Sequence, residues 1–165
     1  MATISSAGTA KTIQRLTGTN GVNASLAALT QPGGTGAAMP GVAQISAQNV
    51  ATELAERSMP VQYPVVNVYC EKIVNNLAEK FQTFSGTAQM MLEIRHSQDL
   101  LDGLQAAVEQ YAGAAMQVLD QNRGDWGDGM YYAGGYQVSF GAVKHGGKNF
   151  VQVAKVSFEL AVGIN

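Results

Sequence analysis

The chain has 165 residues, of which 46% are apolar and only 13% are charged, and its net charge is −2. Because about 25% of the residues in a typical soluble protein are charged, we expect a surface that is partly covered by other subunits or, as the alternative, rich in uncharged polar residues. No run of basic residues is present, which disfavours tight binding of nucleic acid. The single cysteine, Cys70, excludes an intrachain disulfide and fits a reducing compartment.

The N-terminal third differs in composition from the rest of the chain. Residues 1–52 contain no acidic residue, and residues 16–52 contain no charged residue at all. The first ten residues lack the charged start and apolar centre of a signal peptide. The Gly, Thr, Asn and Gln residues that follow exclude a membrane span. We therefore expect a soluble protein that stays inside the cell in which it is made.

Two short helices are predicted in this region, over residues 8–17 and 22–30, followed by a loop rich in Gly and Pro at 31–41. Helices of this length are not stable alone. Residues 1–44 are therefore predicted to form an N-terminal arm, which is either disordered in a free monomer or ordered against a neighbouring subunit. Residues 45–165 are predicted to form the core domain.

The first globular signals are strands. Residues 63–70 are β-branched and aromatic, which predicts a strand, whereas residues 71–81 fit either a helix or a strand. Residues 88–97 alternate between apolar and polar side chains, which predicts a strand. Its inward face would hold Met90, Leu92 and Ile94, and its outward face Gln89, Glu93 and Arg95.

One long amphipathic helix is predicted over residues 98–121, with Ser97 or Asp99 as its N-cap and Gly124 as the left-handed residue that ends it. Apolar residues recur there at spacings of three and four. They are Leu101, Leu104, Val108, Tyr111, Ala115, Val118 and Leu119.

Two strands are predicted at the end of the chain, over residues 136–144 and 149–162, joined by a tight turn at Gly146-Gly147. The last strand has one apolar face, formed by Ala154, Val156, Phe158, Leu160 and Val162. These elements predict an α+β fold. It would be a mainly antiparallel sheet with one long amphipathic helix packed across it, plus the N-terminal extended arm with its short helices.

No catalytic residue, metal site or cofactor is predicted. His96 and His145 have no nucleophile or acid at a recognisable spacing, although a cluster of His96, Cys70 and an acid in the fold would favour an enzyme. The calcium-loop pattern that begins at Asp120 fails at its fifth position, where Gly124 stands in place of a ligand. The phosphate-binding patterns lack the helix that must follow them.

The segment "QNRGDWGDGMYYAGGYQ" (121–137) combines glycines with aromatic residues. Its Arg-Gly-Asp tripeptide is short enough to arise by chance, and nothing else in the sequence indicates adhesion. Glycines and aromatics are typical both of a connection with turns and packed rings and of a contact loop. The composition leaves both interpretations open.

Several segments together resemble the tail terminator (neck) proteins of long-tailed bacteriophages, over residues 45–162. They are "YPVVNVYCEKIVNN", "FSGTAQMMLEIRHSQD", the long helix, and "GDWGDGMYYAGGYQVSFGAVKHGGKNFVQVAKVSFELAV". The resemblance implies a structural virion protein, made in the host cytoplasm, which is not an enzyme. It implies a homo-oligomeric ring, of six subunits in this family, that caps the tail tube, ends tail polymerisation and joins the tail to the head-side connector.

The same resemblance implies that the tail tube protein and the connector or stopper protein are partners. Genome DNA would pass through the lumen without specific binding, and no membrane is involved. The candidate interface residues are Gly124, Asp125, Trp126, Asp128, Tyr131, Tyr132, Tyr136, His145 and Lys148. The alternatives are a head-closure, tail-completion or minor tail protein of similar fold, or a small non-viral binding domain.

Overall fold

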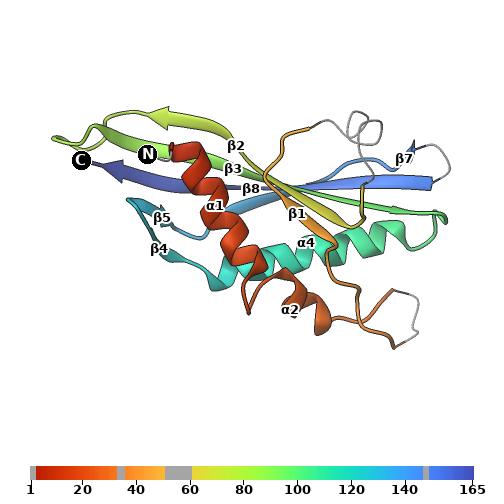
Figure 1. The fold of residues 1–165 in the computed structure, drawn as a ribbon. Helices are drawn as coiled ribbons and strands as arrows, with labels where there is room; N and C mark the ends of the chain where they lie inside the picture. Colours follow the sequence, from red (N-terminus) through yellow and green to blue (C-terminus); the bar gives the residue numbers. More distant parts are fainter. Residues whose placement is uncertain (1–2, 33–35, 51–60, 147–148) are drawn as a thin grey trace.

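The computed structural model describes residues 3–32, 36–50, 61–146 and 149–165, and combines α-helices with a curled, mainly antiparallel β-sheet (Figure 1). The predicted mixture of helices and antiparallel strands is confirmed. The helices are α1 (Ile4–Thr17), α2 (Val22–Ala27) and α4 (Leu104–Gln121). The strands are β1 (Gln44–Ser46), β2 (Val65–Asn75), β3 (Phe84–Gln98), β4 (Gly124–Gly127), β5 (Met130–Tyr132), β6 (Tyr136–Phe140), β7 (Lys144–Gly146) and β8 (Asn149–Ile164).

The sheet is built around the two longest strands, β3 and β8. They pair antiparallel without a register shift, from Phe84 opposite Ile164 to Gln98 opposite Phe150. β2 pairs with the other edge of β3, and β1 adds to β2 in parallel. The other edge of β8 pairs in succession with β7, β6 and β5. The 16-residue strand β8 therefore pairs with β3, β5, β6 and β7 and holds most of the sheet together.

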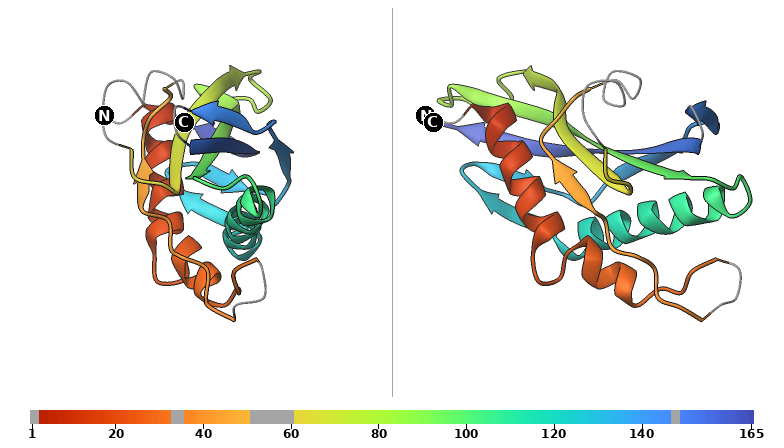
Figure 2. Two further views of the ribbon diagram at one scale, coloured as in Figure 1. Left: turned by 90° about the vertical axis from the view of Figure 1, so that its right-hand side faces the viewer. Right: turned by 45° about the vertical axis from the view of Figure 1, so that its right-hand side comes forward.

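The core lies on one face of this sheet, beneath α1 and α4. The inward residues predicted for β3, Met90, Leu92 and Ile94, are buried there. The predicted apolar face of β8 is buried with them, from Ala154 to Val162 at alternate positions. Seen along the strands, the sheet curls around this core, with α1 beside β2 and α4 beneath β8 (Figure 2). α4 contacts β8 and β3, while α1 contacts mainly β2.

The start of α4 differs from the sequence prediction. The helix begins at Leu104, after Gly103 with φ of 80°, and no side chain caps it. Neither Ser97 nor Asp99 is the N-cap, because β3 continues through Gln98, whose Nε2 donates to the carbonyls of Leu100 and Asp102 at 2.7 and 2.8 Å. This side chain holds the chain in a loop before the helix. Leu101, predicted on the buried helical face, is exposed in that loop.

The end of α4 agrees with the predicted bound, but the role predicted for Gly124 does not hold. The helix ends at Gln121, and the side chain of Asn122 donates from Nδ2 to the Val118 carbonyl at 2.7 Å. Gly124 does have a positive φ, of 118°, but it opens β4 and does not end the helix. A closing hairpin forms from β7 and β8, but Gly146, predicted in the turn, pairs with Asn149 as part of β7. The turn itself lies outside the described residues. The strand predicted over residues 136–144 is divided into β6 and β7.

The N-terminal region packs on the chain's own core, which differs from the expectation of an extended arm. Leu16, Val22 and Leu26 belong to the same buried cluster as β3 and β8. α1 approaches the sheet closely, since a methyl group at Gly8 would lie 3.1 Å from Met90 Sδ. Thr3 caps the helix by accepting from the Ser6 amide at 3.2 Å. A division of the chain at residue 44, and contact of this region with a neighbouring subunit, stay predictions.

This packing makes α1 a determinant of stability. We expect Leu16→Ala to lower the free energy of unfolding by about 2–5 kcal/mol, because it leaves a cavity in the core. The exposed Leu100 provides a matched control, and Leu100→Ala should change stability by less than about 0.5 kcal/mol. Urea denaturation of both variants checks this. Similar midpoints for the two variants would contradict the role of α1 in the core.

Candidate functional site

The segment singled out in the sequence forms a β-hairpin, with β4 and β5 joined by a turn at Gly127-Asp128-Gly129. Trp126 and Tyr132 are buried, and their rings contact each other and Phe158 at centroid distances of 5.3 to 5.9 Å. The structure therefore assigns these two predicted contact residues to the core. The sequence signal for this burial was the alternation within β5, which buries Met130 and Tyr132 and exposes Tyr131.

Helix α1 holds this hairpin with the two charged residues of the N-terminal region. Lys11 Nζ donates to the Trp126 carbonyl at 2.9 Å and pairs with Asp128 at 2.8 Å. The Arg15 guanidinium lies 4.0 Å from the centre of the Trp126 ring. This stacking partly buries Arg15, and burial lowers its pKa. Asp128 is thus engaged within the chain, and the hairpin is fixed to α1 by an ion pair and a cation–π contact.

The remaining predicted contact residues lie at two separate ends of the sheet. Gly124, Asp125 and Tyr131 lie on the β4–β5 hairpin, and Tyr131 is 52% exposed. His145 is exposed on β7, opposite Phe150 of β8. Since Tyr131 pairs with Ala161, eleven residues further along β8, the two positions are roughly 35 Å apart.

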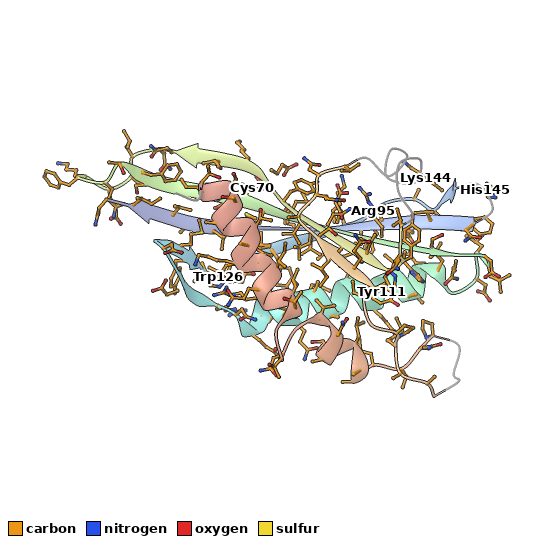
Figure 3. The ribbon with its side chains drawn as sticks, viewed as in Figure 1. Cys70, Arg95, Tyr111, Trp126, Lys144 and His145 are labelled. Carbon is orange, nitrogen blue, oxygen red and sulfur yellow. The ribbon has the colours of Figure 1, made fainter. Side chains whose placement is uncertain are left out.

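Figure 3 shows Trp126 and His145 far apart accordingly. Tyr136 lies between them on β6, and its hydroxyl contacts Asp120 Oδ2 at 3.3 Å. Lys148 lies outside the described residues. The predicted residues therefore do not form one continuous site.

The histidine and the cysteine that would have favoured an enzyme do not come together. Cys70 of β2 pairs with Met90, whereas His96 lies six residues further along β3. At about 3.3 Å per residue the two groups are roughly 20 Å apart. His96 packs against the Tyr111 ring at 5.3 Å, and burial lowers its pKa. His96 is thus a half-buried histidine that packs against the helix α4.

The apolar side chain with the largest exposed fraction among the described residues, that of Phe81, lies with three other exposed apolar side chains at the end of the β2–β3 hairpin, which projects past α1 (Figure 1). We call this set the hairpin-tip patch. Phe81 is 98% exposed and Leu77 is 62% exposed, and both have positive φ, 69° and 49°. Bulky residues rarely adopt this conformation. Ile73 and Val74 are exposed on opposite faces of the end of β2, and they complete the patch.

Sequence reasoning missed the hairpin-tip patch because residues 71–81 fitted two structures. Ile73, Leu77 and Phe81 recur every four residues, which imitates one face of a helix. In the fold, β2 continues to Asn75 because it pairs with β3. Asn75 then shapes the turn, since its Oδ1 accepts from the amides of Leu77 and Ser85 at 3.3 and 3.0 Å. The two neighbouring asparagines were the available signal for a turn.

An open groove of about 790 Å³ lies between α1 and β2. We call it the α1 groove. Cys70 lies in it beside the first turns of the helix (Figure 3), and burial raises the pKa of its thiol. None of the lining residues carries a charge, and these are Ser5, Ser6, Thr9, Ala10, Ile13, Gln14, Ala47, Asn49, Val68, Tyr69 and Cys70.

The face of the sheet opposite the core carries a charged cluster centred on Glu93. Its carboxylate accepts from the Tyr69 hydroxyl at 2.8 Å and from Arg95 Nη2 at 2.6 Å, and Lys155 lies 3.6 Å away. Arg95 also donates to the carbonyl of Val50. Glu93 and Arg95 were predicted to face outward and do point away from the core, yet they are only 8% and 3% exposed.

The surroundings of Glu93 shift its pKa in opposing directions. Burial raises it, but the hydrogen bonds from Tyr69 and Arg95 and the positive charges of Arg95 and Lys155 outweigh burial, so that the pKa is lowered. The carboxylate is thus stabilised in its ionised form. The pKa of Tyr69 is raised by burial and by its hydrogen bond to Glu93. These partners hold one another in place, which indicates a structural cluster, and Nε of Arg95 is the atom of it that has no hydrogen-bond partner among the described residues.

Within the described part of the chain, no three His, Cys, Asp or Glu side chains are grouped so that they could hold a metal ion. No helix there is long and apolar enough to span a membrane. A scan against protein-family models and a search of curated proteins found no match to the chain.

The two faces of the β4–β5 hairpin should respond differently to truncation. We expect Trp126→Ala to lower the free energy of unfolding by about 3–5 kcal/mol, since it removes a buried ring and the surface on which Arg15 stacks. Tyr131→Ala, on the exposed face of the same hairpin, should cost less than about 0.5 kcal/mol. Thermal or urea unfolding followed by circular dichroism measures both. A large loss with Tyr131→Ala would contradict this division.

The charged cluster should make stability depend on pH. A carboxyl group whose pKa is lowered in the folded state stabilises the fold at pH values above its ordinary pKa of 4.5. This contribution is lost as the pH falls through the folded-state pKa. We expect Glu93→Gln to cost about 1–3 kcal/mol at pH 7. The difference from the wild type should shrink below about pH 4.5.

The control for this experiment is Glu159→Gln, at an exposed position on β8. Denaturant titrations between pH 3 and 7 give the free energies. A difference between wild type and Glu93→Gln that does not change with pH would show that the loss comes from packing alone.

Proposed function

We propose that this chain is a ring-forming structural protein of a bacteriophage virion, a tail terminator that caps the tail tube and joins it to the head-side connector. The ring would have about six subunits and no catalytic activity or cofactor. The assignment to a tail terminator rests on the resemblance of segments between residues 45 and 162. The role in assembly rests on the surface described above.

The observation that carries the assembly role is the hairpin-tip patch. An isolated protein gains nothing from a phenylalanine that is 98% exposed at the end of a projecting hairpin. Exposed apolar patches that are large for a monomer commonly mark interaction sites. The patch occurs in a chain with only 13% charged residues, which fits burial of surface between subunits.

The edges of the sheet offer further surfaces for assembly. Among the described strands, β1 ends the sheet on one side, and β6 and β7 pair only with β8 on the other. Unpaired strand edges invite pairing with another chain unless they are covered. A subunit with two different contact surfaces forms head-to-tail contacts, and such contacts close into a ring when the rotation between subunits allows it.

The remaining parts of the fold have roles in this proposal. α4 is the long amphipathic helix packed across the sheet, and it keeps the subunit rigid. Residues 1–44 contact a neighbouring subunit through the surfaces of α1 and α2 that do not face the core. The exposed residues Asp125 and Tyr131 on the β4–β5 hairpin, and His145 on β7, lie at opposite ends of the subunit, where they can meet different partners of the ring.

The native mass of the purified chain, alone and with tail tubes, tests this function. We expect a particle of about six times the 17.3 kDa chain, seen by native mass spectrometry, or a ring that forms only on the end of purified tubes. Electron microscopy of added tubes should show no further elongation once the chain is bound. A chain that stays monomeric and leaves tube growth unchanged would overturn the proposal. Binding to head-side rings alone would favour a head-closure protein.

A further inference from the structure

The hairpin-tip patch and the α1 groove are complementary in chemistry. The patch presents two large apolar side chains, Leu77 and Phe81, that are mostly exposed to water. The groove is open and lacks charged lining residues, so filling it with apolar groups desolvates no ion. Its volume of about 790 Å³ falls within the range of roughly 300–1,000 Å³ that holds ligands much larger than one side chain.

A subunit cannot fill its own groove with its own patch. Cys70 lies in the groove, and the strand continues from there to Asn75, paired with β3 along the way. At about 3.3 Å per residue this places Leu77 roughly 20 Å beyond Cys70, and the hairpin points away from α1. The hydrogen bonds between β2 and β3 would have to break for the tip to fold back. Both surfaces are therefore available to another molecule.

We propose that the hairpin-tip patch of one subunit docks into the α1 groove of the next subunit. This inference rests on the proposed function, because it requires the chain to assemble with copies of itself. A buried aromatic side chain covers about 150–250 Å². Together with Leu77 and one of Ile73 and Val74, which point to opposite faces of β2, Phe81 supplies part of the roughly 800 Å² per partner of a stable interface.

The positive φ values at the tip support this assignment. Leu77 and Phe81 both hold a left-handed backbone conformation, which costs energy for residues with bulky side chains. The hairpin thereby presents both side chains before any partner arrives. A backbone that already holds its conformation loses less freedom when the hairpin binds, which favours association. Patch and groove are different surfaces of one subunit, so the contact is head-to-tail.

Cross-linking tests the contact directly, because Cys70 is the only cysteine of the chain. Lys80→Cys places a second thiol beside Phe81 and keeps the anchors intact. Under mild oxidation we expect a ladder of disulfide-linked oligomers, and mass spectrometry should identify a peptide that joins Cys70 to position 80. Adding Cys70→Ser to Lys80→Cys should abolish the ladder. Asp99→Cys, an exposed charged position at the other end of β3, should give none.

The cross-linking outcomes separate this inference from the proposed function. Rings of normal mass without the expected peptide, or disulfides only between two copies of position 80, would overturn the docking and leave the ring intact. A chain that stays monomeric, alone and with tail tubes, would overturn the proposed function and this contact with it. A ladder that contains the expected peptide supports both.

Substitution of the anchors provides a second measurement. We expect Leu77→Ser and Phe81→Ser each to weaken self-association at least about 30-fold, as truncation of a central interface residue does. Their thermal unfolding as monomers should match the wild type, because both side chains are exposed. Leu101→Ser, at an equally exposed leucine beyond the end of β3, is the matched control and should leave association unchanged. Equal association of all three variants would overturn the proposal.

Discussion

The antiparallel pairing of β3 with β8 is the constraint on which the rest of this structure depends. It runs without a register shift over the 15 residues of β3. A shift by one residue would turn Met90 and Leu92 away from the core and bring Glu93 into it. β2 and the short strands β5, β6 and β7 pair along the outer edges of this pair, so its register also sets their positions.

Several of the few charged residues are used inside the subunit. Lys11 and Arg15 fix the β4–β5 hairpin to α1, and Glu93 and Arg95 pair where water hardly reaches them. Only 13% of the residues are charged, and some of these are paired within the subunit, so few charged side chains remain to hydrate the surface. The number of charged side chains free to interact with water at the surface is therefore lower than the composition alone indicates.

The parts of the fold that follow from local pattern were predictable, and those that depend on distant contacts were not. Alternation alone located β3 and the buried face of β8, because a strand with one covered face must alternate. The start of α4 depends on the side chain of Gln98, which holds the preceding loop, and composition does not reveal such a bond. For α1, a weak helical signal could not show that Leu16 enters a core whose main part, from Val66 onward, lies 50 or more residues later.

The candidate site was harder to predict because it depends on the length of β8 and on where β2 ends. Residues 121–137, with their many aromatic side chains, fitted a contact loop by composition, yet the fold buries Trp126 and Tyr132 and separates Tyr131 from His145. The exposed apolar residues were in the sequence all along. Their spacing of four resembled a helix because nothing local shows that β3 extends the pairing of β2 to Asn75.

The geometry of β2 links the two surfaces of the proposed contact. The α1 groove includes Cys70, the hairpin-tip patch begins at Ile73, and the register of β2 against β3 shifts between Cys70 and Lys72. Such an irregularity bends a strand and increases its twist. It therefore sets the direction in which the tip leaves the groove of its own subunit. In a head-to-tail assembly this direction fixes the rotation between neighbours, and hence whether copies close into a ring or continue as a filament.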